Sequence, residues 1–534
     1  MSEKKYKKIK EVDRVVIRFA GDSGDGMQLT GSQFTETTAV MGNDLATYPD
    51  FPAEIRAPAG SLAGVSSFQI QFSSDIIQTP GDDLDVLVAM NPAALKTNLQ
   101  DLKESGIILA NKANYTKKNL KLAGWESNPL EDDTLKNYQL IDLDMTKIVA
   151  HAVEDMGLSP KTVSRSTNMF ALGLMFWMYD RSMDSTLSFL KKKFAKRPEL
   201  VESNVRALKA GYHYGDTIEA VQSSYKVPKA TFEPGIYRNI MGNQALCYGL
   251  MAAANKSNCE LFYGGYPITP ASDILHILAS HKNFKVKTFQ AEDEIAAIMS
   301  VIGASFSGLL GVTATSGPGI ALKSEAMGLA VSTELPLVIV NVQRGGPSTG
   351  MPTKTEQADL LQALFGRNGE APIPVIAAST PADCFYVAFE ACRIALEHMT
   401  PIILLSDAYI ANGSEPWLIP SMDNLSEIKN HIVKNGNGFL PFKRNKKQLA
   451  RNWALPGSPT LEHRVGGLEK DEQTGNVSYD PLNHQKMTDL RHQRVDIIAE
   501  SIPKVKPYGS KIGDILVLGW GSTFGSIRSA VNEA

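Results

Sequence analysis

The stretch EDEIAAIMSVIGASFSGLLGVTATSGPGIALKSEAMGLAVSTELPLVIVNVQ (residues 292–343) alternates helix-length runs with short apolar runs. Residues 292–308 and 320–332 have the length and apolar spacing of helices. Each is followed by an apolar run, at 310–317 and 335–343, that is as long as a buried strand. Because strands joined through helices pair in parallel, this alternation predicts an α/β layered sheet.

The same alternation extends over residues 237–415. Its other helix and strand pairs are NQALCYGLMAAA before CELFYGG, ASDILHILAS before VKTFQ, KTEQADLLQALFG before IPVIAA, and PADCFYVAFEACRIALEH before PIILLSDA. Such regularity predicts a doubly wound parallel sheet, in which ligands bind at the carboxyl ends of the strands.

Residues 12–215 predict a second α/β domain. It begins with a strand at 14–19, a glycine loop and a helix that starts near Met27. Later come the apolar run LDVLVAMN (84–91), a helix from Pro92, and the strand GIILAN (106–111). Short apolar runs between amphipathic ones again indicate a sheet covered by helices.

The remaining segments have a different character. Residues 216–236 carry prolines and no helical period, so we expect a linker. Residues 416–505 are polar and rich in turn residues, which predicts an irregular insertion. Residues 506–534, which include GDILVLGWGSTFGSIRSAVNEA, predict one strand, a glycine turn and one helix. Since a lone strand and helix cannot bury their apolar faces, we expect this to be the start of a truncated domain.

Composition narrows the classes of protein. A chain of 534 residues is expected to hold two to four domains, and a net charge of −3 gives no indication of a nucleic-acid or membrane partner. No apolar run is long enough for a membrane span, and no apolar run follows the basic residues 1–8, which we interpret as a solvated tail and not a secretory signal. The cysteines lack Cys-x-x-Cys spacing, so we expect buried thiols in a reducing cytoplasm and no disulfide, zinc site or iron–sulfur cluster; they are Cys247, Cys259, Cys384 and Cys392.

The loop AGDSGDGMQLTG (residues 20–31) raises three interpretations. Gly24-Asp25-Gly26 is how a thiamine diphosphate site usually begins, but the window in which a second, Asn ligand for its metal is expected reads PDFPAEIRAP, and Asn43 falls too early. A dinucleotide loop is disfavoured, because the glycine order is G-x-x-G-x-G and the carboxylates of Asp22 and Asp25 would repel a pyrophosphate. The plainer interpretation is a strand-to-helix turn that needs a positive φ.

Four stretches at predicted strand ends carry chemistry: GGYPITPASD (264–273), QAEDEIAAIMSVIG (290–303), TSGPGIALKSEAMG (315–328) and QRGGPSTGMPTKTEQAD (343–359). Plainer interpretations exist for three of them. Thr269 and Pro270 fit the cap and first residue of a helix, the three acids fit a solvated first turn, and TSGPG fits a packing loop. The fourth combines Arg344 with glycines and hydroxyls after a strand, which is typical of a site.

In this order, YPITP, EDEIAAI, TSGPG and RGGPSTGMPTKTEQ resemble the α-chain of the 2-oxoacid:ferredoxin oxidoreductases. The resemblance implies a γ-type domain at 12–215, on AGDSGDG and YPDFPAEIRAPAG, and a thiamine diphosphate pyrimidine-binding domain at 237–415. GWGST is similar to the start of the family's transketolase-C-like domain, at 506–534.

The resemblance also implies roles for residues. The family divides its thiamine diphosphate site between two chains, so we expect the β-subunit to hold the Mg²⁺ motif and a [4Fe–4S] cluster, with no metal ligand here. The acid that pairs with the aminopyrimidine is assigned to Glu294, which has Gly303 nine residues on, with Glu292 as the alternative. A buried carboxyl suits this role because burial raises its pKa and keeps it a donor. Further cofactor contacts are assigned to Tyr266, Pro267, Ile268 and Gly317.

For the substrate, the resemblance assigns Arg344 and Thr269 to the 2-oxoacid carboxylate. Loop position suggests Thr349, Thr353 and Lys354 for the distal carboxylate of a dicarboxylic substrate. The implied reaction is CoA-dependent oxidative decarboxylation of 2-oxoglutarate to succinyl-CoA with reduction of ferredoxin, in an αβ or α₂β₂ assembly. Pyruvate or a branched-chain 2-oxoacid as substrate, a nucleotide-dependent enzyme that uses residues 21–26, and a non-catalytic assembly subunit are the alternatives.

Overall fold

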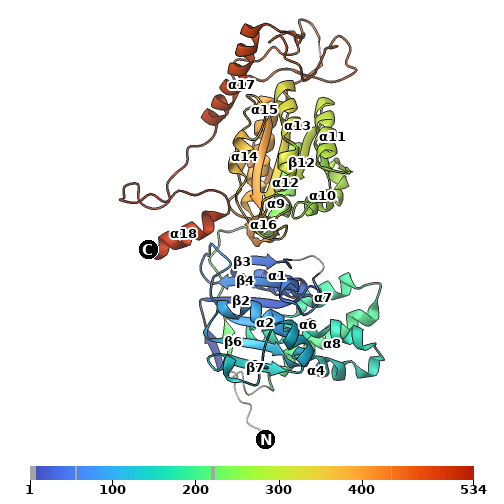
Figure 1. Cartoon of the computed structure of the whole chain (residues 1–534), viewed down its shortest axis with the longest axis vertical. Coiled ribbons are helices and arrows are strands. Elements are labelled where there is room, and N and C mark those ends of the chain that lie inside the picture. Colours follow the sequence, from blue (N-terminus) through green and yellow to red (C-terminus); the bar gives the residue numbers. More distant parts are fainter. Residues whose placement is uncertain (1–7, 54–56, 218–222, 435) are drawn as a thin grey trace. The chain divides into compact units, whose positions relative to one another are not determined.

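The computed structural model describes residues 8–53, 57–217, 223–434 and 436–534. The chain forms two compact units, Met1–Asn239 with Gly413–Ile419, and Ile240–Asn412 with Pro420–Ala534 (Figure 1). Three sequence predictions lie wholly or partly outside the described residues: the basic tail, the centre of YPDFPAEIRAPAG at 54–56, and residues 218–222 of the linker. In the described ranges, no helix combines the length and the apolar character that crossing a bilayer requires.

A mixed sheet forms the centre of the first unit. Its strand order is β3 (Asp44–Asp50), β4 (Val65–Ser73), β2 (Arg14–Asp22), β5 (Leu84–Ala89), β6 (Leu102–Asn111) and β7 (Gln139–Leu143). β2, β5, β6 and β7 are parallel, whereas β4 runs antiparallel to β2 and β3. The predicted α/β class is confirmed for this unit.

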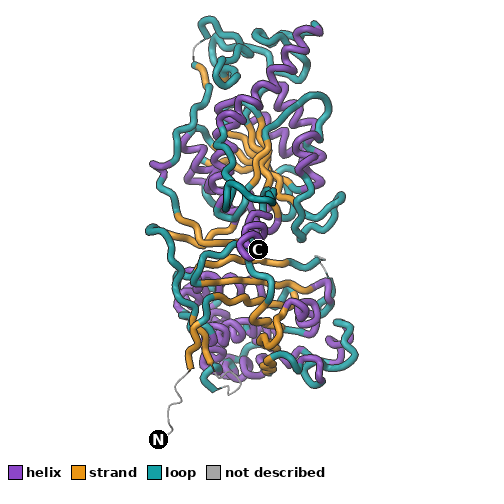
Figure 2. The backbone as a smooth tube through the Cα atoms, turned by 90° about the vertical axis from the view of Figure 1, so that its left-hand side faces the viewer, coloured by secondary structure: helices purple, strands orange, loops and turns teal. Residues whose placement is uncertain are grey.

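Helices cover both faces of this sheet, as Figure 2 shows by colour. One core joins the sheet to α1 (Met27–Val40), α4 (Met145–Ala152), α6 (Thr167–Met178), α7 (Asp184–Lys193) and α8 (Pro198–Tyr214), and the other joins it to α2 (Pro92–Asn98) and α3 (Lys117–Leu122). The short helix α5 (Pro160–Arg165) precedes α6. α6 is buried along its whole length, because its sequence TNMFALGLMFWM has no charged residue.

The glycine loop at residues 20–26 is a strand-to-helix turn. Gly26 has a φ of 75° and is the N-cap of α1. The Asp25 carboxylate accepts a hydrogen bond from the Asp22 amide at 2.8 Å, and the Asp22 carboxylate accepts one from the Gly60 amide at 3.0 Å. Asp25 therefore organises the backbone of the loop and Asp22 ties the loop to Gly60, which confirms the turn interpretation.

The boundaries of the first unit differ from the predicted ones. Within the predicted linker, β8 (Ser223–Lys226) pairs in parallel with β1 (Lys8–Glu11). The segment 413–419, with β16 (Ser414–Leu418), also belongs to this unit, where the hydroxyls of Ser414 and Thr47 lie 2.9 Å apart. β16 pairs with β9 (Tyr237–Met241). Local composition missed these strands, because they pair with residues distant in sequence.

A parallel sheet forms the centre of the second unit. Its order is β11 (Val286–Gln290), β10 (Leu261–Gly265), β12 (Leu310–Thr315), β13 (Leu337–Gln343), β15 (Pro401–Asp407) and β14 (Val375–Ala377), and every pairing in it is parallel. One core joins it to α11 (Glu294–Phe306), α12 (Gly317–Leu322), α13 (Ser324–Thr333) and α14 (Leu360–Phe365). α9 (Gly242–Lys256), α10 (Ser272–Ala279), α15 (Asp383–His398) and α16 (Ala408–Asn412) complete the unit. The doubly wound parallel sheet predicted from residues 237–415 is confirmed.

The polar segment 416–505 is less irregular than predicted. It contains α17 (Pro481–Ser501) and the short strands β17 (Ile432–Val433) and β18 (Trp453–Ala454). The buried face of α17 includes Met487, Arg494 and Ile498, so a charged residue interrupts its apolar period. That interruption is the reason why periodicity did not reveal the helix.

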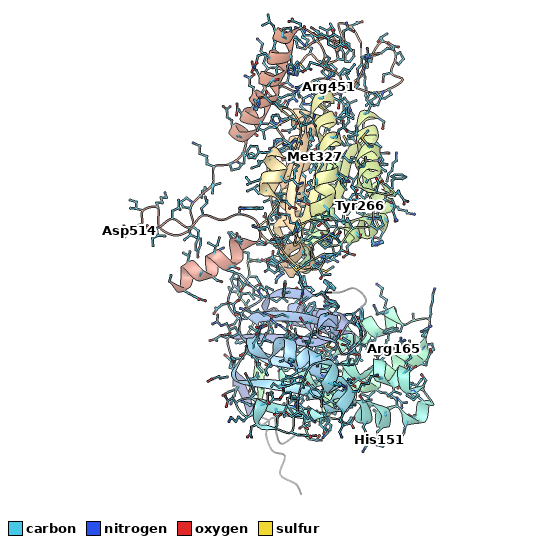
Figure 3. The ribbon with its side chains drawn as sticks, viewed as in Figure 1. His151, Arg165, Tyr266, Met327, Arg451 and Asp514 are labelled. Carbon is cyan, nitrogen blue, oxygen red and sulfur yellow. The ribbon has the colours of Figure 1, made fainter. Side chains whose placement is uncertain are left out.

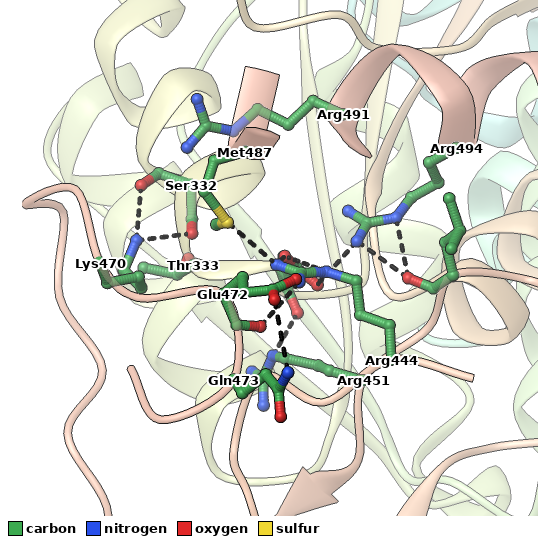
Figure 4. Close-up of polar contacts among 12 residues, drawn as sticks. Ser332, Thr333, Arg444, Arg451, Lys470, Glu472, Gln473, Met487, Arg491 and Arg494 are labelled. Atoms are coloured by element: carbon green, nitrogen blue, oxygen red, sulfur yellow. Dashed lines mark hydrogen bonds and ion pairs between the residues drawn. The ribbon is translucent and has the colours of Figure 1, made fainter. Parts of the chain in front are cut away.

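A buried carboxylate anchors this segment. Glu334, which directly follows α13, accepts a hydrogen bond from Arg494 at 2.7 Å and pairs with Arg444, and its backbone carbonyl accepts one from Arg451 at 3.1 Å (Figure 4). Burial would raise the pKa of Glu334, but Arg494 and Arg444 outweigh it and lower the pKa to about 2. Glu334 thus organises three guanidinium groups of the inserted segment, two through its ionised carboxylate and one through its backbone carbonyl.

The end of the chain corrects another prediction. α18 (Thr523–Glu533) forms as expected, but residues 514–518 form no strand and pair with none in the described part of the chain. Ile515, Leu516 and Leu518 are exposed. A strand needs a partner for its backbone hydrogen bonds, and none is available here. Instead, residues 520–522 are held by Gln357, which donates to the Trp520 carbonyl at 3.1 Å and accepts from the Ser522 amide at 2.8 Å.

Candidate active site

The candidate site lies where β10, β11, β12 and β13 end. These strands are parallel, so the residues that follow them emerge at one edge of the sheet. Tyr266 directly follows β10, Glu294 begins α11 after β11, Gly317 begins α12 after β12, and Arg344 directly follows β13. Figure 3 shows Tyr266 within the second unit. The topology therefore brings the four motifs to one edge.

Tyr266 is buried and joins two of the motifs. Its hydroxyl lies 2.8 Å from the hydroxyl of Thr315, the last residue of β12. Burial raises the pKa of Tyr266 to about 12, against the opposing effect of the Thr315 hydrogen bond. The ring also packs with Ile268, Ala291 and Ala297 in a small apolar cluster. Tyr266 thus forms a neutral wall of the site, with Ile268 partly buried against the same cluster and Pro267 exposed.

The acids at the start of α11 have separate positions. Asp293 is the N-cap, and its carboxylate accepts a hydrogen bond from the Ala296 amide at 2.8 Å. Glu292 is exposed, whereas Glu294 is half-buried and is the first residue of the helix. Of the two predicted candidates, Glu294 therefore lies closer to the interior of the unit.

Arg344 connects the loop after β10 to the loop after β13. Its Nη1 donates to the Thr269 carbonyl at 2.7 Å, and its Nη2 donates to the Thr349 carbonyl at 3.1 Å. Its Nε is buried without a hydrogen-bond partner in the described structure, and burial lowers the pKa of the guanidinium. Arg344, Thr269 and Thr349 are thus brought together, although the last two contribute backbone carbonyls to this contact.

Other predicted residues lie differently. Thr269 does not cap α10, which begins at Ser272 after the N-cap Ala271, so the plainer interpretation of YPITP is wrong. Thr353 and Lys354 are half-buried in the loop, and the Lys354 carbonyl accepts a hydrogen bond from the Gly345 amide at 2.9 Å. The proposed role of these two side chains at the substrate stays a prediction.

Glycine is required beneath the Tyr266 hydroxyl. A Cβ on Gly319 would lie 2.0 Å from the Tyr266 hydroxyl oxygen and 2.2 Å from that of Thr315. Ser316, the N-cap of α12, has a buried hydroxyl without a hydrogen-bond partner in the described structure. The TSGPG loop therefore brings backbone close to the site, with an unused polar atom beside Gly317.

Several residues near the site were missed. Lys323, at the junction of α12 and α13, is fully buried, and its ammonium donates to the Glu294 carbonyl at 2.6 Å. Asp359 accepts from the Asn341 amide at 2.9 Å, and burial raises the pKa of its carboxyl. In the sequence, the position of Lys323 directly after the apolar Leu322 was the one local sign of a special role. That pattern does not distinguish a buried lysine from a surface lysine.

The predicted burial of the thiols is confirmed, since all four cysteines are free and buried. Among the described residues, no group of three or more His, Cys, Asp or Glu side chains is arranged to hold a metal ion.

The fold and site define an α/β protein with a carboxyl, a neutral phenol and a guanidinium at the carboxyl ends of strands in one parallel sheet. Residues 252–480 match the family described as "Pyruvate flavodoxin/ferredoxin oxidoreductase, thiamine diP-bdg", and residues 16–214 match "Pyruvate ferredoxin/flavodoxin oxidoreductase". The 2-oxoglutarate oxidoreductase subunit KorA of Mycobacterium tuberculosis is 55% identical over 526 residues, which cover 98% of this chain and 80% of the relative.

Two further comparisons agree. The 2-oxoacid:ferredoxin oxidoreductase subunit alpha of a Sulfolobus species is 27% identical, over 96% of this chain and 84% of the relative. The structure of 2-oxoglutarate:ferredoxin oxidoreductase from Magnetococcus marinus, with 2-oxoglutarate, coenzyme A and succinyl-CoA bound, matches with a TM-score of 0.81 and 29% identity, over 98% of this chain and 86% of that one. The chain belongs to the family of 2-oxoacid:ferredoxin oxidoreductase α-subunits, which confirms the predicted resemblance.

Proposed function

We propose that this chain supplies the aminopyrimidine-facing half of a thiamine diphosphate site, together with the carboxylate site for 2-oxoglutarate. The observation that carries this is the convergence of Glu294, Tyr266 and Arg344 at one edge of the parallel sheet, after β11, β10 and β13. The 2-oxoglutarate enzymes among its relatives support the choice of substrate.

The residues present fit the cofactor. A half-buried carboxyl at the start of α11 is suited to hydrogen-bond a ring nitrogen, and Ile268 and Tyr266 offer an apolar and aromatic wall. The Ser316 hydroxyl has no hydrogen-bond partner in the described structure, and the backbone of Gly319 lies close to the Tyr266 hydroxyl. Both features suit a loop that receives a flat ring. Gly317 and Pro267 lie on the same two loops.

When bound, thiamine diphosphate supplies the carbon that adds to the 2-oxoacid carbonyl and accepts the electron pair left by decarboxylation. The protein's part is positioning. The Glu294 carboxyl exchanges a proton with the ring nitrogen. Arg344 pairs with the carboxylate of the substrate, through its free Nε or by exchanging one of its carbonyl partners. The Thr269 hydroxyl and, for the distal carboxylate, Thr349, Thr353 and Lys354 complete the proposed contacts.

A partner chain is part of this proposal. The exposed face of α11 carries Ile295 and Met299, which are 49% and 42% exposed, followed by Gly303, whose Cβ would meet nothing within 4 Å. An apolar face beside Glu294 is suited to a β-subunit that closes the cofactor site. That subunit would carry Mg²⁺ and a [4Fe–4S] cluster, with CoA as acyl acceptor and ferredoxin as electron acceptor.

The test is 2-oxoacid-dependent reduction of a viologen dye by the complex purified from its own host. We expect reduction that requires CoA and is faster with 2-oxoglutarate than with pyruvate or a branched-chain 2-oxoacid. Glu294→Gln should abolish reduction, while Glu292→Gln serves as the matched control and should keep it. Faster reduction with pyruvate would reassign the substrate. No reduction with any 2-oxoacid, despite a bound partner, would leave the chain as an assembly subunit.

A further inference from the structure

Lys323 is a fully buried lysine that the proposed chemistry leaves without a role. Its three ammonium hydrogens have three neighbours. Nζ donates to the Glu294 carbonyl at 2.6 Å and to the Thr313 hydroxyl at 3.3 Å, and it lies 5.1 Å from the centre of the Tyr266 ring. One amine therefore contacts the start of α11, the strand β12 and the loop after β10.

The position is electrostatically unusual. A cation near the first turn of a helix is disfavoured by the helix dipole, and a buried lysine loses its hydration. Burial lowers the pKa of Lys323 to about 7, with Glu294 and Asp293 acting in the opposite direction. A methionine of similar length would fill the same space without these costs. The charge at this position thus needs an explanation beyond packing.

We propose that Lys323 is a positioning residue for Glu294: its buried ammonium ties the first turn of α11 to β12 and to the Tyr266 ring, and it is the positive neighbour of the Glu294 and Asp293 carboxylates. This inference rests on the proposed function, because it takes Glu294 as the acid that meets the cofactor. Losing the ammonium would leave the Glu294 carbonyl and the Thr313 hydroxyl without this donor and would let the helix start shift.

The experiment compares Lys323→Met with Lys282→Met in the complete complex. Lys282 is exposed in the short helical turn that precedes β11, at the opposite end of that strand from the site. Binding of thiamine diphosphate to the cofactor-free complex is followed by protein fluorescence and by near-ultraviolet circular dichroism. For Lys323→Met we expect weaker cofactor binding and a kcat about 100-fold lower with the KM for 2-oxoglutarate little changed, as a displaced reacting group predicts. Lys282→Met should match the parent.

The pH dependence of cofactor affinity gives a second readout. The groups that face Lys323 are Glu294 and Asp293 from α11 and Tyr266 from the loop after β10. The parent should show an ionisation near pH 7, which disappears in Lys323→Met. In Glu294→Gln it should move to lower pH, because the negative charge that favours the ammonium is gone.

The results that would overturn the role of Lys323 differ from those that would overturn the proposed function. Parent-like cofactor affinity, kcat per bound cofactor and pH profile in Lys323→Met would overturn the inference. If Lys323→Met does not assemble, Thr313→Val decides the question, because it removes one acceptor with little change in volume: weaker cofactor binding supports the role, and unchanged binding overturns it. Failure of the proposed function would instead appear in the dye-reduction assay, as full activity of Glu294→Gln.

Discussion

The guanidinium of Arg344 donates to the carbonyl of Thr269 at 2.7 Å, across 75 residues of sequence. This contact fixes the loop after β10 against the loop after β13. The carbonyl is a neutral partner, so the positive charge of Arg344 is not neutralised by it and remains available to an anionic substrate. The same residue therefore holds two loops together and carries the positive charge that the proposed function assigns to the substrate carboxylate.

Replacing Arg344 tests this double role. In Arg344→Ala we expect kcat/KM for 2-oxoglutarate to fall about 100-fold, since hydrogen bonds to charged groups contribute about 1.5–3 kcal/mol. The kcat/KM of Arg344→Lys should lie between those of the parent and Arg344→Ala, because lysine keeps the positive charge but lacks the planar guanidinium. Steady-state dye reduction measures both, with Lys282→Ala as the charge-matched control on an exposed position. An unchanged kcat/KM in Arg344→Ala would remove Arg344 from the substrate site.

Gly319 offers a test of the hydroxyl pair formed by Tyr266 and Thr315. In Gly319→Ala the new Cβ would lie 2.0 Å from the Tyr266 hydroxyl oxygen, so the ring must move. We expect about 1–3 kcal/mol of destabilisation and loss of cofactor binding. Gly328→Ala is the matched control, because its Cβ meets nothing within 4 Å within the helix α13. There, alanine should stabilise by up to about 1 kcal/mol. Equal behaviour of the two variants in thermal denaturation and cofactor titration would contradict the role of the pair.

Glu334 should determine whether the segment 416–505 stays attached. Its folded pKa of about 2 is lower than its ordinary value of 4.5, so its stabilising contribution is complete at neutral pH. That contribution decreases as the pH falls from about 4.5 towards about 2. Glu334→Gln leaves buried guanidiniums without their counter-charge, which should cost about 3–5 kcal/mol.

Hydrogen exchange of the α17 amides measures this cost. Glu427→Gln is the control, because Glu427 lies in the same segment in an exposed pair with Lys256, and its loss should cost less than about 1 kcal/mol. Protection of α17 that is the same in Glu334→Gln and the parent would show that apolar contacts alone hold this segment.

The exposed face of α11 should bind the partner subunit. Met299→Arg introduces a charge on this face without disturbing the core, so we expect a folded chain that binds the β-subunit at least about tenfold more weakly. Met422→Arg is matched in exposure, at 41% against 42%, and lies outside the proposed interface. Calorimetric titration of the purified subunits distinguishes the two. Equal affinities would place the partner elsewhere on the chain.

Much of the fold could be read from the chain, because both sheets are built from runs whose periods differ clearly. The α/β class, the parallel pairing of strands in the second unit and the convergence of YPITP, EDEIAAI, TSGPG and Arg344 at strand ends all follow from local patterns. The helix α17 and the strand β8 did not follow, because a buried arginine interrupts one period and a distant partner defines the other. The expected strand at 514–518 failed for the related reason that it has no neighbour to pair with in the described chain.

The sequence by itself determined which residue types follow each strand, and hence the class of chemistry at that edge of the sheet. Tertiary structure alone decided which of the three acids is partly buried, that Arg344 contacts backbone carbonyls, and that the Lys323 ammonium donates to the Glu294 carbonyl. The physical reason is that helix and strand periods depend on neighbours a few residues away. Burial, charge pairing and the hydrogen bonds of a buried lysine depend instead on residues that only the folded chain brings together.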